Sequence, residues 1–158
     1  MNRLIHGDCL EYLRTTEDKF DCIFADPPDN LKLDYDNYTD YRDDYYDWLD
    51  LIIREALLKT PVFWLSYYHS HDLELKFRIR QILKKYHPAH KCRQFVWVFN
   101  FGQYRETDAP SDHRPILRVS SPLWKPTMTE RIESVREKMG DLRATGKGRV
   151  PGDVWEYD

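Results

Sequence analysis

The chain has 158 residues, 41% of them hydrophobic and 32% charged, which fits one globular domain with a buried core. Its three cysteines, Cys9, Cys22 and Cys92, lie far apart without a Cys-x-x-Cys pair, which argues against a disulfide scaffold or a cysteine-rich zinc site. No stretch is long and apolar enough to span a bilayer, so we expect a soluble protein of a reducing, intracellular compartment.

The net charge of −3 is distributed unevenly along the chain. Residues 1–60 carry seven Lys/Arg against fifteen Asp/Glu, whereas residues 61–158 carry seventeen against twelve. A basic second half would suit a polyanion such as nucleic acid. The solvated faces of ordinary helices explain the same counts, so charge alone leaves both interpretations open.

The first 25 residues predict two strands that flank a short helix. Residues 3–6 form the first strand candidate, and Asp8 followed by Glu11 is a capping-box pattern at a helix start. Asp8 could instead face a bound ligand. Residues 20–25 are apolar except for one aspartate, which is typical of a short buried strand.

That strand leads into a turn whose sequence is Asp26-Pro27-Pro28-Asp29-Asn30. Two successive prolines fix φ and cannot donate to a sheet ladder, so strand pairing should stop where Asp26 begins. The sequence therefore predicts a carboxylate at a strand end, followed by backbone carbonyls of preset direction. Such an arrangement suits a site whose hydrogen-bond acceptors wait in fixed positions for a donor group.

The sequence Asp26-Pro27-Pro28 resembles the catalytic tetrapeptide of the amino-group DNA methyltransferases, which modify N6 of adenine or N4 of cytosine. Upstream, residues 4–13 with Gly7-Asp8-Cys9 resemble the helix start that precedes this tetrapeptide in the branch whose catalytic motif lies near the N-terminus. The resemblance covers roughly residues 3–125. It implies an α/β fold, a Rossmann-like methyltransferase sheet flanked by helices.

The same resemblance implies S-adenosyl-L-methionine as the cofactor, DNA as the partner, and a role in DNA methylation and restriction-modification. It places the protein in the cytoplasm of a bacterial or phage-infected cell, without a metal or a membrane. The target base would be flipped out of the duplex, and the resemblance does not distinguish adenine from cytosine. Two alternatives remain: a methyltransferase acting on RNA or a protein amide, and a noncatalytic DNA-binding remnant.

The resemblance also implies roles for individual residues. The carboxylate of Asp26 and the carbonyl of Pro27 or Pro28 would accept the hydrogens of the target amine, so that its nitrogen becomes pyramidal and nucleophilic. The residues expected at the cofactor are Asp8, Cys9 and Asp26. Those expected at the DNA substrate are Asn30, Tyr35, Tyr38, Arg105, Arg114 and Lys125, with Lys147 and Arg149 as further phosphate candidates.

This chain departs from the family pattern at Asp29, which stands where an aromatic residue usually follows the prolines. Asp29 is included among the catalytic candidates, although a carboxylate cannot stack on a base. Either Tyr35 or Tyr38 stacks in its place, or Asp29 recognises the base through hydrogen bonds, or activity is impaired. The family's Phe-x-Gly-x-Gly cofactor turn is also absent from the sequence.

We therefore expect an incomplete sheet that lacks its central strands, between the strand at 3–6 and the strand at 21–25. A remaining C-terminal segment or a second chain would complete it. Residues 1–122 are predicted to form the partial catalytic core. Residues 123–158 are predicted to be a helix and a basic loop that lead into a target-recognition or connecting region.

The rest of the chain predicts alternating helices and strands. Residues 31–47, rich in Asp and Tyr, are expected to form a mobile loop over the site without a calcium motif. His69 and His71 are interpreted as structural residues at a helix start rather than metal ligands. Leu58, Leu73 and Phe77 are expected to face inward. The predicted elements are a helix from 43 or 44 to about 60, a strand at 62–66 parallel to 20–25, a helix at 70–86, an antiparallel strand pair at 94–101 and 115–119, and a helix at 127–142.

Overall fold

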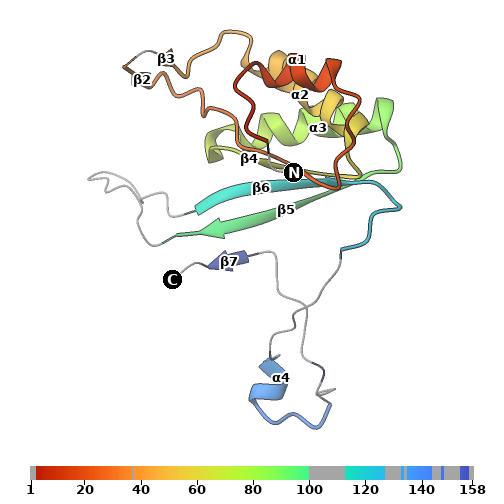
Figure 1. Ribbon diagram of the computed structural model, residues 1–158. Helices are drawn as coiled ribbons and strands as arrows, with labels where there is room; N and C mark the ends of the chain where they lie inside the picture. Colours follow the sequence, from red (N-terminus) through yellow and green to blue (C-terminus); the bar gives the residue numbers. More distant parts are fainter. Residues whose placement is uncertain are drawn as a thin grey trace, which may run out of the picture.

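The computed structural model describes residues 3–36, 38–99, 113–126, 133, 135–143, 147 and 154–156. Helices and strands alternate along the chain, as expected for a mixed α/β protein (Figure 1). The elements are α1 (Cys9–Thr15), β1 (Ile23–Ala25), β2 (Asp34–Tyr35), β3 (Tyr38–Thr39), α2 (Tyr45–Lys59), β4 (Val62–Ser66), the 3-10 helix η1 (His69–His71), α3 (Asp72–Tyr86), β5 (Lys91–Val98), β6 (His113–Ser120), α4 (Val135–Lys138) and β7 (Val154–Glu156).

Five strands form one sheet in the order β1-β4-β6-β5-β7. β1 pairs parallel to β4 with Ile23 opposite Phe63, which confirms the predicted parallel unit around α2. β6 pairs antiparallel to both β4 and β5, which confirms the predicted antiparallel pair. β7 adds parallel to β5 and was not predicted. Within the described residues, β1 is therefore an edge strand, with a partner on one side only.

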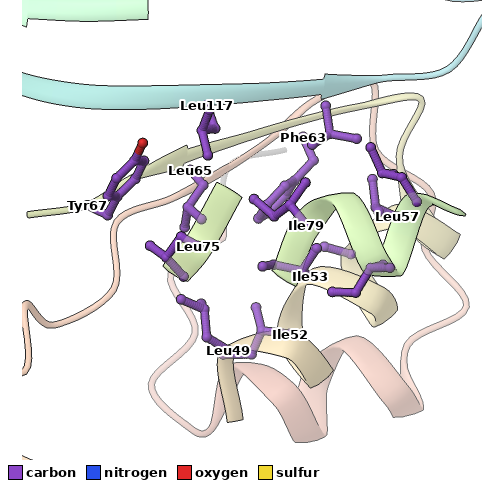
Figure 2. Close-up of a cluster of buried hydrophobic side chains, with 14 of the residues drawn as sticks. Leu49, Ile52, Ile53, Leu57, Phe63, Leu65, Tyr67, Leu75, Ile79 and Leu117 are labelled. Atoms are coloured by element: carbon purple, nitrogen blue, oxygen red, sulfur yellow. The ribbon is translucent and has the colours of Figure 1, made fainter. Parts of the chain in front are cut away.

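Helices α1, α2 and α3 lie together on one side of the sheet and cover its core face (Figure 1). Successive side chains of a strand alternate between faces, so Phe63 and Leu65 of β4 point to the same side as Leu117 and Val119 of β6. Figure 2 shows this cluster packed against the helices. Burial of each such side chain contributes about 1.5–3 kcal/mol, so this face holds the layers together. The helix residues in the cluster include Leu49, Ile53, Ala56, Leu75 and Ile79.

The opposite face of the sheet carries aromatic rings stacked on an arginine. The Arg118 guanidinium carbon lies 5.4 Å from the Trp64 ring centroid, 5.1 Å from that of Phe95 and 4.9 Å from that of Trp124. Burial among these rings, with a smaller effect of the Arg93 charge, lowers the pKa of Arg118. This face therefore carries aromatic and charged side chains, whereas the face under the helices is mainly aliphatic.

Two predictions near the N-terminus were wrong. Residues 3–6 form no strand, and the side chain of Leu4 is fully exposed. The strand predicted at 20–25 shortens to β1, where Phe24 is 58% exposed rather than buried. Within the described residues, residues 3–6 have no strand to pair with, and no strand flanks the outer edge of β1. Phe24 is paired with Trp64, so its side chain points to the face of the sheet away from the helices.

The two long helices agree with their predicted spans within about two residues, but their buried faces were partly misjudged. Leu58, Leu73 and Phe77 were expected inside and are exposed. Leu57 and Leu75 are buried instead. One residue along a helix turns the side chain by about 100°, so a small phase error moves a leucine from the core to the surface.

Among the described residues, the C-terminal helix ends earlier than predicted. α4 covers only Val135–Lys138 and ends in a turn at Gly140, whose φ of +66° favours glycine. The predicted capping box at 127–130 lies outside the described residues. No helix in the described ranges is long and apolar enough to cross a membrane.

Candidate active site

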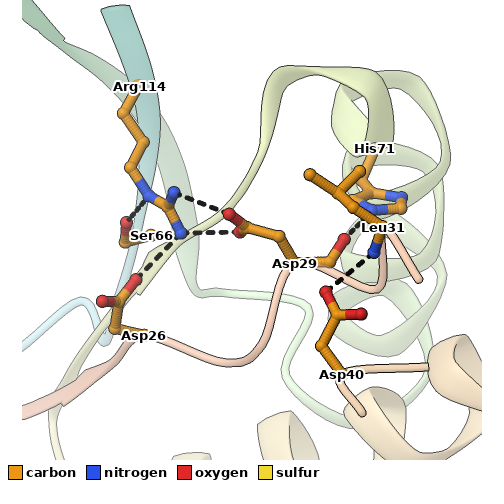
Figure 3. Close-up of polar contacts among 7 residues, drawn as sticks. All are labelled: Asp26, Asp29, Leu31, Asp40, Ser66, His71 and Arg114. Carbon is orange, nitrogen blue, oxygen red and sulfur yellow. Dashed lines mark hydrogen bonds and ion pairs between the residues drawn. The ribbon is translucent and has the colours of Figure 1, made fainter. Parts of the chain in front are cut away.

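The predicted turn lies where three strands of the sheet meet (Figure 3). Asp26 follows β1 directly, and Ser66 is the last residue of β4. Since β1 and β4 are parallel, both residues lie at the carboxyl ends of these strands, on the same side of the sheet. The antiparallel β6 begins on that side and supplies Arg114.

The Arg114 guanidinium joins the three strand ends. Its Nη1 donates to Oδ2 of Asp29 over 3.1 Å and its Nη2 to Oδ1 of Asp29 over 2.8 Å. Nη2 also donates to Oδ1 of Asp26 over 3.0 Å, and Nε donates to Oγ of Ser66 over 2.6 Å. Burial alone would lower the pKa of Arg114, but Asp29 and then Asp26 raise it overall. The group is therefore a fixed cation between two carboxylates.

The main chain of Asp29 is held from the opposite side by His71. The ring nitrogen Nε2 lies 2.7 Å from the Asp29 carbonyl oxygen. A carbonyl can only accept, so Nε2 carries the hydrogen, and Nδ1 is left to accept from the Tyr46 hydroxyl at 2.7 Å. His71 lies at the start of α3, where a helix start was predicted, and its side chain is buried. In the described ranges, no group of three His, Cys, Asp or Glu side chains could hold a metal ion.

The loop after the turn contains regular structure that the sequence did not predict. It contains the β2–β3 hairpin, whereas we expected a segment without regular structure. Asp40 is only 2% exposed, and its carboxylate accepts the amides of Leu31 and Leu33, each at 2.8 Å. Asn30 and Lys32 have positive φ values of 54° and 62°, which are uncommon for residues other than glycine.

A cavity of about 480 Å³ lies beside the turn, among α1, β1 and α2. Asp26, Pro27 and Pro28 form part of its wall. Most of the remaining wall is apolar or aromatic, and includes Cys9, Tyr12, Ile23, Phe24, Tyr38, Trp48, Ile52 and Phe63. An adjoining cavity of about 580 Å³ shares Cys9 and Tyr12 and also touches Asp8. In open α/β sheets, ligands usually bind at the carboxyl ends of the strands, where this turn lies.

The predicted cofactor residues lie at the start of α1. Oδ1 of Asp8 accepts the amides of Leu10 at 2.7 Å and Glu11 at 3.0 Å, so Asp8 caps the helix. Burial, together with the Asp8 charge, raises the pKa of the Cys9 thiol. Cys9 and Asp26 line the same cavity, which brings together two of the three residues expected at a cofactor.

The predicted substrate residues are more scattered. Tyr38 is exposed and lines the cavity, whereas the side-chain oxygen of Asn30 accepts the amide of Arg42 at 2.7 Å. Tyr35 belongs to β2, but the placement of its side chain is not described. Arg114, expected at a phosphate, is instead engaged by two carboxylates. Lys125 and Lys147 are exposed, and Arg105 and Arg149 lie outside the described residues.

Sequence reasoning missed Ser66 and Asp40 as parts of the site. Ser66 could have been found, because a polar residue at the end of an apolar strand parallel to β1 must lie near Asp26. Asp40 gave no such signal among its many acidic neighbours. The two positive-φ residues that its carboxylate supports are not glycines, so the sequence did not mark the turn.

The fold is that of an α/β protein, and the candidate site around Asp26 lies at the carboxyl end of β1, an edge strand among the described residues. Solved structures of this class confirm the expected Rossmann-like methyltransferase fold. The M1.HpyAVI–SAM complex superposes with a TM-score of 0.54 at 17% identity, covering 82% of this chain and 60% of that one. TTHA0409 of Thermus thermophilus, provisionally named a DNA modification methylase, gives 0.52 at 16% identity, covering 95% and 64%.

Curated relatives are similar in sequence as well. DNA adenine methyltransferase YhdJ of Escherichia coli K12 is 27% identical over an alignment of 169 positions, covering 98% of this chain. Type II methyltransferase M.BamHI of Bacillus amyloliquefaciens is 42% identical over an alignment of 62 positions, covering 34% of this chain. The chain spans only 56% of YhdJ and 15% of M.BamHI. No protein-family model matches the chain.

Proposed function

We propose that the chain is the catalytic part of an S-adenosylmethionine-dependent DNA methyltransferase that modifies the exocyclic amine of a flipped adenine (N6) or cytosine (N4). The observation that carries the proposal is the Asp26–Pro28 turn, which follows β1 and forms part of the wall of a largely apolar cavity. The names of both curated relatives, which are methyltransferases, support the same class of reaction.

The role of the turn follows from the chemistry of the target amine. Its lone pair is delocalised into the base ring, so the nitrogen becomes nucleophilic only when acceptors bind its hydrogens and make it pyramidal. Oδ1 of Asp26 is bonded to Arg114, and no described residue donates to Oδ2. Oδ2 is therefore available for one amine hydrogen, and the Pro27 or Pro28 carbonyl for the other. Acceptors fixed in advance need little reorganisation during the reaction.

The cavity fits the proposed cofactor in size and in wall chemistry. Its volume of about 480 Å³ lies in the usual range for small-molecule sites, roughly 300–1,000 Å³. Tyr12 and Trp48 offer aromatic faces to an adenine ring, and Asp26 offers a negative charge to a sulfonium cation. S-adenosylmethionine would supply the electrophilic methyl group. Cys9 and the helix cap at Asp8 complete this side of the proposed site.

The proposed DNA contacts lie on both sides of the turn. Tyr38 is exposed at the cavity and can stack on a flipped base. Asn30 lies in the same turn as Asp26 and has a positive φ. The basic residues beyond β4, including Lys125, would meet phosphates. On this proposal residues 1–122 form the partial catalytic core, and residues 123–158 lead into a recognition or connecting region.

The proposed sheet is completed by strands that the described residues do not contain. Among the described strands none pairs with the outer edge of β1, and the exposed ring of Phe24 lies on this strand. An unpaired apolar edge strand is a template for a further strand. We propose that a further segment of the protein or a second chain binds there. Calorimetric titration of the 158-residue chain with S-adenosylmethionine tests this, since tight binding without any addition would refute it.

The function is tested by a methyl-transfer assay on the assembled protein, that is, the chain together with the further segment or second chain that completes its sheet. Radiolabelled S-adenosylmethionine should label duplex DNA with the wild-type protein, and Asp26→Asn should reduce kcat by about 100-fold or more. Labelling only of RNA or protein would favour the alternative substrate. DNA binding without any labelling, in a protein that binds the cofactor, would establish the noncatalytic alternative.

Cysteine protection locates the cofactor independently of turnover. Cys9 lines the proposed cofactor cavity, whereas Cys92 lines a separate cavity beside α3. In the assembled protein, S-adenosylmethionine should therefore slow alkylation of Cys9 by iodoacetamide and leave the alkylation rate of Cys92 unchanged. Equal rates with and without saturating cofactor would show that the cofactor binds elsewhere.

A further inference from the structure

We propose that Asp29 is a positioning residue: it holds the Arg114 guanidinium so that one oxygen of Asp26 stays free for the substrate amine. The inference rests on the proposed function, because it concerns the same carboxylate. It also gives a physical reason for an acidic residue after the two prolines. Asp29 is then neither a stacking residue nor a direct base contact.

The geometry of the guanidinium separates the two carboxylates into different roles. Asp29 receives both terminal nitrogens, at 2.8 and 3.1 Å, in the parallel arrangement that arginine prefers with a carboxylate. Asp26 receives only a shared contact from Nη2 at 3.0 Å. Ser66 occupies Nε. Figure 3 shows the resulting fan of contacts, with Asp29 and Asp26 on two sides of the same group.

Exposure separates the two carboxylates in the same way. The side chain of Asp29 is 24% exposed and that of Arg114 is 21% exposed, so this pair is largely withdrawn from water. The side chain of Asp26 is 62% exposed and contributes to the cavity wall. The inner carboxylate therefore neutralises the arginine, and the outer one faces the space where a ligand would bind.

Asp29 is also fixed through its main chain, which a mere surface ion pair would not require. His71 donates to its carbonyl, and the next residue, Asn30, has a positive φ and is bonded to the amide of Arg42. These contacts fix the position of the Asp29 backbone, from which its carboxylate extends. Arg114 is thus met by a carboxylate that cannot easily move away.

Loss of the Asp29 charge would change the Arg114–Asp26 contact. Asp26 is the only other carboxylate bonded to Arg114 among the described residues. Arginine would then form its two-pronged contact with Asp26 and occupy both oxygens, which leaves none for the amine. Catalysis would fall because the acceptor is blocked, even though Asp26 itself is unchanged.

A double-mutant design in the assembled protein tests this mechanism. Asp29→Asn should lower kcat by about 10- to 100-fold with KM for DNA changed less than about threefold, as for a misplaced catalytic group. Arg114→Gln added to Asp29→Asn should raise kcat at least about fivefold above Asp29→Asn alone, since no cation then blocks Asp26. Asp29→Glu should recover most of the loss. Additive losses in the double variant, or no recovery by glutamate, would overturn the proposal.

A spectroscopic measurement separates this inference from the proposed function. The side-chain carboxyl ¹³C resonance of Asp26, measured without cofactor or DNA, should move in Asp29→Asn. It should stay in place in Asp21→Asn, the matched control, because Asp21 is exposed and lies before β1. An unmoved Asp26 resonance in Asp29→Asn would refute the positioning role. A wild-type protein that transfers no methyl group would instead refute the proposed function and leave this resonance test standing.

Discussion

Asp40 anchors the loop that carries the proposed site, and its removal gives a prediction with a magnitude. Its buried carboxylate accepts two amides at 2.8 Å, on either side of the positive-φ residue Lys32. Hydrogen bonds to a charged group contribute about 1.5–3 kcal/mol each, so two would give about 3–6 kcal/mol. Leu31 and Leu33 are exposed, and water can partly replace the lost acceptor. We therefore expect Asp40→Ala to lower the free energy of unfolding by about 2–4 kcal/mol.

Two measurements check this expectation at different scales. Urea denaturation followed by circular dichroism gives the change in global stability, and amide hydrogen exchange reports the two amides directly. Exchange at Leu31 and Leu33 should accelerate in Asp40→Ala. Asp36→Ala is the matched control, since Asp36 is an exposed aspartate of the same hairpin. Unchanged exchange at both amides, with an unchanged urea midpoint, would refute the anchoring role.

Three further predictions concern the core and the titrating groups. Phe63→Ala, at a fully buried position, should cost about 3–5 kcal/mol in urea denaturation; less than about 1 kcal/mol would contradict the packing in Figure 2. Burial raises the pKa of both Tyr45 and Tyr67 above the unfolded value of 10.0. Stability from these groups should thus be full below pH 10.0 and fall above it by about 1.4 kcal/mol per pH unit for each tyrosine. Tyr67→Phe should reduce that slope, and an equal slope would contradict the burial argument. Burial also raises the pKa of Cys92, so iodoacetamide should modify it more slowly at about pH 8 than free cysteine, and an equal rate would exclude a raised pKa.

Local sequence patterns predicted the elements whose neighbours lie close in the sequence. β4 has its predicted bounds because five apolar or small residues between Pro61 and Tyr67 leave little alternative. The spans of α2 and α3 were predicted from the helical spacing of their apolar residues and from the prolines that follow them. The failures at residues 3–6 and at Phe24 have a different origin, because strand pairing and side-chain burial depend on segments that are distant in the sequence. The local sequence of one strand does not indicate which distant segment, if any, pairs with it.

The same division applies to the candidate site. The prolines predicted a rigid turn with Asp26 at a strand end, since their effect on φ is local. Contacts to Arg114 cross 88 positions to Asp26 and 85 to Asp29, and no periodic pattern reaches so far. Arg114 was selected as one of several basic residues and assigned to phosphate. Its actual neighbours are acidic because the antiparallel strand β6 begins at the end of the sheet where β1 ends.

Under the proposed function, Asp29 stands where the resembling family has an aromatic residue, so a different part of the site would have to stack on the base. The carboxylate acceptor survives the replacement, since Arg114 is shared between Asp29 and Asp26 and one oxygen of Asp26 has no described donor. Stacking then needs a ring from another element that reaches the same cavity. Tyr38 meets that requirement, because it is exposed, lines the cavity and belongs to the hairpin that Asp40 joins to the turn. The acidic substitution and the anchored hairpin are therefore two parts of one arrangement, and loss of the Asp40 anchor should weaken base binding more than cofactor binding.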